Sequence, residues 1–164
     1  MTGRRFFWLA VGMFVVALAV AWVVLPDRVP LHFGADGRVD RWGSRERAVV
    51  EMAGVGLLLG AMMLSLAMSA WRLPFSFVSL PDKEFWERPE NQRVARRRVQ
   101  DDMYHVGGSL MVFLTGILGF TVFVADDATP SWWPWGVVVI VACIAGLGTA
   151  LVLRMRFYKR LPGE

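Results

Sequence analysis

The sequence contains one cysteine, two histidines and two tyrosines in 164 residues. The single cysteine, Cys143, excludes an internal disulfide and a metal site built from several cysteines. It lies inside an apolar run, where a free cysteine behaves as a small hydrophobic residue. The chain also lacks internal repeats, low-complexity segments and any developed catalytic or cofactor motif. The sequence therefore predicts neither an enzyme nor a bound cofactor.

Charged residues are absent from long parts of the chain, although 20% of its residues are charged. Hydrophobic residues make up 55% of the sequence, against roughly 45–50% in soluble domains. A helix of twenty residues is about 30 Å long, which matches the hydrocarbon core of a bilayer. We therefore predict an all-α integral membrane fold, a single domain over residues 1–164 with a four-helix transmembrane bundle. The predicted spans are residues 6–25, 48–71, 106–125 and 134–153.

The first apolar run also admits a second interpretation, a cleavable signal peptide. Ala17-Leu18-Ala19 has the small residues of a cleavage site. However, the apolar run continues past this point through Trp22 to Leu25. We therefore interpret residues 6–25 as the first transmembrane helix.

Lysine and arginine are distributed unequally between the segments that connect the spans. Thirteen of the eighteen lie in the N-terminal tail, the connection 72–105 and the C-terminal tail, and five lie in the loop 26–47. Because positively charged loops stay in the cytoplasm, we predict that both termini are cytoplasmic and that loop 26–47 faces outward. The predicted location is a bacterial inner membrane. Interfacial aromatic residues are then Trp8, Trp71 and Tyr104 on the inner side and Trp22, Trp132, Trp133 and Trp135 on the outer side.

The cytoplasmic connection has two predicted parts. The first, Leu73–Trp86, contains two prolines and is predicted to be irregular, with its aromatic residues Phe75, Phe77, Phe85 and Trp86 dipping into lipid headgroups. The second is a helix that begins at Pro89 and runs into the third span. Its arginines are predicted to contact lipid headgroups, and a solvated helix is the alternative. These arginines are Arg93, Arg96, Arg97 and Arg98.

Small residues four positions apart predict places where helices approach closely. The second span has Gly56 and Gly60, and the fourth has Ala142, Gly146 and Ala150. We interpret both patterns as packing within the chain, with homo-oligomerisation as the alternative.

The loop 26–47 is predicted to be a small structured unit between the first two spans. Val29, Leu31 and Phe33 alternate with other residues as in a short strand. Asp36-Gly37 is typical of a tight turn, and Arg38–Trp42 can return as a second strand. Because an isolated hairpin is marginally stable, we expect it to pack on the ends of the helices.

Several polar groups in and near this loop are candidates for a site. His32, Asp36 and Asp40 have the chemistry of metal ligands, but we favour a hydrogen-bonded His32 that organises the hairpin and predict no metal. Glu51 is predicted to form a salt bridge with a nearby arginine, and Ser44 to cap the second helix. The predicted partner-binding or loop-organising residues are His32, Phe33, Asp36, Gly37, Asp40, Trp42, Arg45 and Glu51.

The loop carries Leu25-Pro26, Val29-Pro30, His32-Phe33, Asp36-Gly37, Asp40, Trp42 and Ser44-Arg45, in that order. This order resembles a bacterial membrane family of unknown function, which forms the first part of the Sdp-type toxin-immunity proteins. Leu80-Pro81-Asp82-Lys83 with Trp86 is similar to a Leu-Pro-Asn-Lys-x-x-Trp stretch in some members. The arginine-containing motif of the immunity proteins' second half is not found, so immunity itself is not carried over.

These features predict a non-enzymatic membrane protein whose partners are the lipid bilayer and a peptide or protein bound at the outer loop. The resemblance implies a role in envelope stress, sensing or immunity. The alternative is an accessory subunit of a larger transporter or respiratory complex. Nothing in the sequence indicates nucleic-acid binding.

Overall fold

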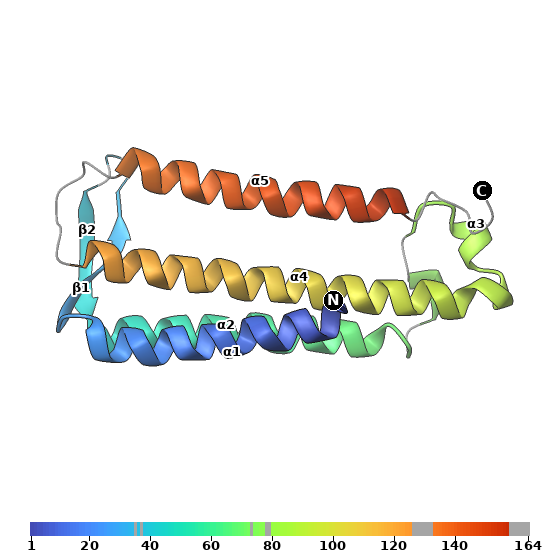
Figure 1. The fold of residues 1–164 in the computed structure, drawn as a ribbon, viewed down its shortest axis with the longest axis horizontal. Helices are drawn as coiled ribbons and strands as arrows, with labels where there is room; N and C mark the ends of the chain where they lie inside the picture. Colours follow the sequence, from blue (N-terminus) through green and yellow to red (C-terminus); the bar gives the residue numbers. More distant parts are fainter. Residues whose placement is uncertain (35, 37, 73, 78–79, 126–132, 158–164) are drawn as a thin grey trace.

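The computed structural model describes residues 1–34, 36, 38–72, 74–77, 80–125 and 133–157 (Figure 1). The chain is mostly helical, with one antiparallel pair of strands. The elements in chain order are α1 (Gly3–Val24), β1 (Arg28–Phe33), β2 (Val39–Ser44), α2 (Arg45–Ser69), the 3-10 turn η1 (Phe75–Phe77), α3 (Lys83–Trp86), α4 (Pro89–Val124) and α5 (Trp133–Phe157).

The four long helices lie lengthwise beside one another, with α4 between the α1–α2 pair and α5 (Figure 1). The hairpin of β1 and β2 stands across one end of the helices, here called the hairpin end. The short helix α3 lies at the opposite end, here called the α3 end. The described part of α5 ends toward the α3 end, and α1 begins on that side as well.

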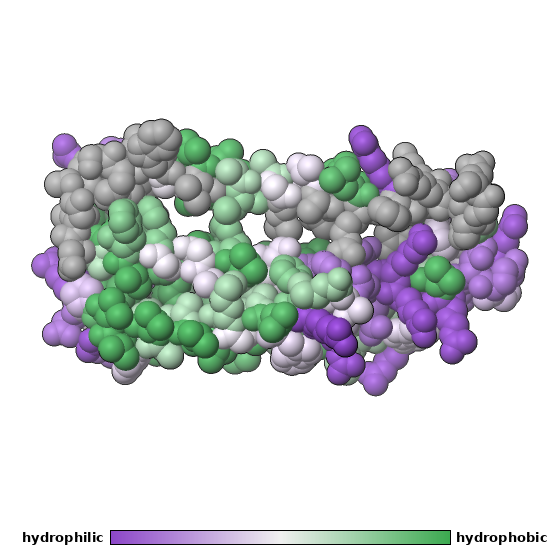
Figure 2. All heavy atoms as spheres, viewed as in Figure 1, coloured by the Kyte–Doolittle hydropathy of each residue, from purple (hydrophilic) through white to green (hydrophobic). Residues whose placement is uncertain are grey.

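Three helices, α1, α2 and α4, are long and apolar enough to cross a membrane, judged by length and composition among the described residues. Large apolar side chains on these helices are exposed, among them Val23 at 77% and Leu57 at 75%. Figure 2 shows an apolar band over the middle of the helices and hydrophilic residues toward both ends. This distribution indicates contact with a lipid bilayer. The predicted fourth span falls within α5, whose described apolar stretch runs from Gly136 to Gly146.

The helices pack through glycines that accept aromatic rings. Gly107 and Gly108 of α4 are buried, and the rings of Phe7 and Phe6 from α1 occupy the space where their side chains would be. The ring of Phe14 likewise occupies the space where a side chain at Gly56 of α2 would be. The predicted role of Gly56 in packing within the chain is therefore confirmed.

The helix α4 is continuous from Pro89, as the sequence predicts. Its 36 residues extend about 54 Å at 1.5 Å per residue, beyond the roughly 30 Å of a hydrocarbon core. The excess length forms part of a small core at the α3 end. Trp86 is fully buried there against Phe75 and Ala95. The prediction that Phe75 and Trp86 dip into headgroups is wrong, because burial against α4 removes both from the surface; Phe77 remains 76% exposed.

Side chains of α4 also hold the ends of its two neighbours. The carboxylate of Asp101 accepts the backbone N–H of Gly3 at 2.7 Å, at the start of α1. At the end of α2, Arg96 Nη1 donates to the carbonyl of Ala70 at 2.7 Å, and Gln100 Nε2 donates to that of Ala67 at 3.2 Å. These bonds satisfy backbone groups that a helix leaves unpaired at its ends. They fix α1 and α2 in register with α4.

Candidate functional site

The predicted hairpin is confirmed. Strands β1 and β2 pair antiparallel, with Val29 opposite Gly43 and Pro30 opposite Trp42, and the register becomes irregular between Pro30 and Phe33. At the turn, the backbone N–H of Gly34 donates to the carbonyl of Arg38 at 2.8 Å.

The predicted turn is described in part. Asp36 lies in it, and its Oδ1 accepts the backbone N–H of Arg38 at 3.1 Å. This contact is the local hydrogen bond that makes aspartate common in turns. Gly37, also predicted to act here, lies outside the described residues.

The base of the hairpin is anchored in the helices. Val29 is fully buried in a cluster with Leu25, Val49 and Leu118, which come from the end of α1, the start of α2 and the end of α4. Burying a valine side chain contributes roughly 1.5–3 kcal/mol. The prediction that the hairpin packs on the helix ends is confirmed, and its lower part has a fixed orientation relative to α1 and α2.

Arg45 connects the two ends of the loop at the base of the hairpin. Its backbone N–H donates to the carbonyl of Asp27 at 3.3 Å, and Nη1 donates to the carbonyl of Leu25 at 3.2 Å. Nη2 lies 3.3 Å from the carboxylate of Asp27. Arg45 therefore holds the end of α1 and the start of α2 together, at the point where the loop leaves the helices. Its side chain is only 27% exposed, which indicates a structural role more than a partner contact.

The start of α2 follows the predicted pattern. Ser44 caps the helix, because its Oγ accepts the N–H of Arg47 at 3.3 Å. Glu51 pairs with Arg47 one turn earlier, with Nε 2.7 Å from Oε1. The salt bridge predicted for Glu51 is thus confirmed, and the two charges neutralise each other near the hairpin end of the span.

His32 and Asp40 meet across the upper part of the hairpin. His32 Nδ1 lies 2.6 Å from Asp40 Oδ1, and the side chains are 60% and 53% exposed. The predicted hydrogen bond of His32 is therefore present, and it lies at the surface of the protein. An exposed pair contributes little to stability. Its polar atoms are instead available to a partner.

Trp42 carries a contact that the sequence interpretation missed. The guanidinium of Arg28 lies 4.9 Å from the centre of the Trp42 ring, a cation–π arrangement. The signal was present in the sequence, because a turn centred on Asp36 places Pro30 opposite Trp42 and Arg28 diagonal to it. Phe33, the remaining predicted site residue, is half-buried and pairs with Val39.

A metal site receives no support from the geometry. Within residues 1–34, 36, 38–72, 74–77, 80–125 and 133–157, no group of three or more His, Cys, Asp or Glu side chains is arranged to hold an ion. Asp36 is directed to the backbone of Arg38, while Asp40 is paired with His32.

The four arginines of α4 divide into two classes. Arg96 bonds the end of α2 and lies 5.7 Å from the ring centre of Phe75, and Arg98 lies 5.3 Å from that of the buried Trp86. Arg93 and Arg97 are exposed. The structure therefore gives Arg96 and Arg98 partners within the protein, and headgroup contact by Arg93 and Arg97 stays a prediction.

Residues 8–57 match the model of a protein family. This family is described as "Domain of unknown function (DUF1648)". The matched segment runs from Trp8 in α1 through the whole hairpin to Leu57 in α2, so it is centred on the hairpin and covers less than a third of the 164 residues. No curated protein and no solved structure matches the chain. The comparison thus relates the hairpin and its two flanking helices to a family, and it assigns no activity.

Proposed function

We propose that the chain is a bacterial inner-membrane protein with four spans and cytoplasmic termini, and that it presents the hairpin on the outer side. The apolar lengths of α1, α2 and α4 support this arrangement, and α5 lies beside α4 as a fourth long helix. The excess of lysine and arginine in the N-terminal tail, the connection 72–105 and the C-terminal tail supports the orientation.

The proposed activity is non-enzymatic recognition of a peptide or protein partner by the hairpin. The observation that carries this proposal is the combination of a fixed base and an exposed, chemically varied upper part. Val29 and Arg45 fix the base, and the exposed His32–Asp40 pair lies in the upper part. Nearer the base, the exposed Arg28 stacks on the half-buried Trp42. A preorganised surface binds with a smaller loss of conformational entropy. Tryptophan and arginine are also the residues that most often dominate binding energy.

The proposed biological setting of this recognition rests on the resemblance described above, because the family match assigns no activity. The matched segment contains the hairpin, and the resemblance to Sdp-type immunity proteins favours a role in envelope stress, sensing or immunity. The alternative is that the chain is an accessory subunit of a larger transporter or respiratory complex, and the purification experiment below distinguishes the two.

Affinity purification from membranes in mild detergent tests the proposed recognition. We expect His32→Ala and Trp42→Ala each to reduce the captured partner at least about tenfold, because a central anchor typically contributes 2 kcal/mol or more. Phe77→Ala is the matched control, since it removes an exposed aromatic ring at the α3 end and leaves the hairpin unchanged.

Hydrogen exchange of residues 29–33 and 39–44 separates loss of contact from loss of folding. Slow exchange in both hairpin variants with loss of the partner supports the proposal. Fast exchange throughout these strands in the wild-type protein contradicts a preformed platform. A stoichiometric large complex that survives both substitutions identifies the chain as an accessory subunit instead.

A further inference from the structure

The first turns of α1 carry a surface that the function proposed for the hairpin does not use. Thr2, Arg4, Arg5, Trp8 and Leu9 line a shallow pocket of about 600 Å³ that is open to the surface. All five side chains are exposed, with Trp8 at 49% and Leu9 at 65%. The pocket therefore has a cationic part and an apolar part within two helical turns.

The positive charges of this pocket have no partner of opposite charge in the described part of the chain. Among the residues that the structure describes, neither Arg4 nor Arg5 has a hydrogen bond, an ion pair or a ring contact through its side chain. The nearby carboxylate of Asp101 is engaged by the N–H of Gly3 and lies 3.2 Å from His105 Nδ1. Two adjacent guanidinium groups thus favour an anionic ligand supplied from outside the chain.

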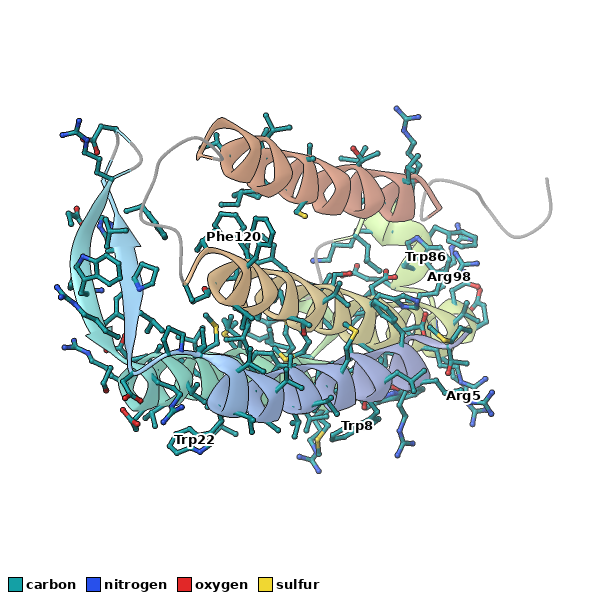
Figure 3. The ribbon with its side chains drawn as sticks, turned by 60° about the vertical axis from the view of Figure 1, so that its left-hand side comes forward. Arg5, Trp8, Trp22, Trp86, Arg98 and Phe120 are labelled. Carbon is teal, nitrogen blue, oxygen red and sulfur yellow. The ribbon has the colours of Figure 1, made fainter. Side chains whose placement is uncertain are left out.

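The position of the pocket along α1 identifies the level of the membrane at which it lies. Residues 6–24 of α1 carry no charge and extend about 28 Å, close to the roughly 30 Å of a hydrocarbon core. If this stretch crosses the core, Arg4 and Arg5 lie at the level of the headgroups, and Trp8 lies at the interface where tryptophan is enriched. Figure 3 shows Trp8 and Trp22 on the side of α1 that points away from α4.

The apolar part of the pocket continues along the same helix. Leu9, Met13, Val16, Val20 and Val23 follow at helical spacing and are 44–77% exposed. A molecule bound at Arg4 and Arg5 would therefore meet a continuous apolar stripe suited to an acyl chain. A free anion such as phosphate would use only the charged part, so the whole surface fits a phospholipid better.

We propose that Arg4, Arg5, Trp8 and Leu9 form a binding site for an anionic phospholipid. The two arginines bind the phosphate of the headgroup, and the Trp8–Val23 face of α1 packs against the acyl chains. This site is separate from the partner-binding hairpin, which lies at the other end of α1 (Figure 3). It is also separate from Arg93 and Arg97 on α4.

Native mass spectrometry of the full chain released from detergent tests the site, with phosphatidylglycerol and phosphatidylethanolamine as probes. We expect the wild-type protein to retain phosphatidylglycerol about tenfold more strongly, since each arginine close to an anionic headgroup adds appreciably to binding. The R4Q/R5Q variant should lose this preference, and R4K/R5K should keep most of it. The Arg93→Gln/Arg97→Gln variant is the comparison, because it removes the same charge from exposed positions on α4, whose predicted headgroup contacts lie outside this site.

Each result of the lipid-retention experiment either supports or overturns the proposed site. Loss of the preference in R4Q/R5Q but not in the α4 variant supports the site. Equal retention of both lipids by the wild-type protein, or equal losses in the two glutamine variants, overturns it, because binding then reflects general charge at the α3 end. Complete displacement of phosphatidylglycerol by millimolar inorganic phosphate would also overturn it, since the ligand would then be a small anion.

Discussion

Replacing Trp86 with alanine is expected to open the small core at the α3 end. Trp86 is fully buried between Phe75 and Ala95, and the guanidinium of Arg98 lies 5.3 Å from its ring centre. Removing a buried tryptophan side chain typically costs about 3–5 kcal/mol. We expect the loss to fall mainly on the connection between α2 and α4, because the packing of α1 on α4 does not involve Trp86.

Limited trypsin digestion of the purified protein measures this effect at Arg72 and Lys83. Cleavage at both sites should accelerate at least about tenfold in Trp86→Ala, because local opening of the connection exposes them. Phe77→Ala is the control, since Phe77 is 76% exposed and its loss should change stability by no more than about 0.5 kcal/mol. Equal resistance of the two variants would show that Trp86 does not hold the connection.

Substituting Gly56 with alanine is expected to separate α1 from α2. A Cβ atom at this position would overlap the ring of Phe14, which is itself buried at 4% exposure. Overpacking of this kind typically costs about 1–3 kcal/mol. A shorter side chain at position 14 should restore part of the loss, so Gly56→Ala/Phe14→Leu should be more stable than Gly56→Ala alone.

The same helix offers a matched control for this substitution. A Cβ atom at Gly54 would have no heavy atom within 4 Å, so Gly54→Ala should be neutral or slightly stabilising through helix propensity. Unfolding of α2 in detergent by titration with a denaturing surfactant compares the two variants. If Gly56→Ala and Gly54→Ala unfold at the same surfactant fraction, the close contact between Gly56 and Phe14 is wrong.

The helices and the hairpin could be predicted because each has a local signal. Uncharged apolar runs of about twenty residues indicate helices, and the alternation around Val29 with the turn at Asp36 indicates a pair of strands. Ser44 and Pro89 mark the starts of α2 and α4 in the same local way. Such signals do not depend on which elements become neighbours.

The small core at the α3 end could not be predicted in this way. The sequence from Leu80 to Trp86 resembles an interfacial aromatic segment, and only contact with Ala95 shows that Trp86 is internal. Asp82 adopts a left-handed backbone conformation, with φ of 55°, just before α3. Aspartate and asparagine tolerate this conformation better than most residues, which gives a physical reason for an Asp or Asn at this position.

Side-chain roles at the hairpin were predictable in kind but not in detail. His32 and Asp40 do meet, but their exposure depends on how the rest of the chain packs around the hairpin, which the local sequence does not show. Arg45 was expected among the partner-binding residues, whereas its side chain bonds the carbonyl of Leu25 and lies beside the carboxylate of Asp27 at the base of the hairpin. Long-range contacts decided both cases.

The central claim is that the hairpin faces the outside of the cell while the α3 end faces the cytoplasm. Labelling of intact cells with a membrane-impermeant maleimide tests it most directly, in a Cys143→Ser background that removes the native thiol. Asp36 and Glu90 are both exposed and lie at opposite ends of the helices. Asp36→Cys should react in intact cells, and Glu90→Cys should react only after the membrane is opened. Reaction of Glu90→Cys in intact cells with protection of Asp36→Cys would contradict the claim.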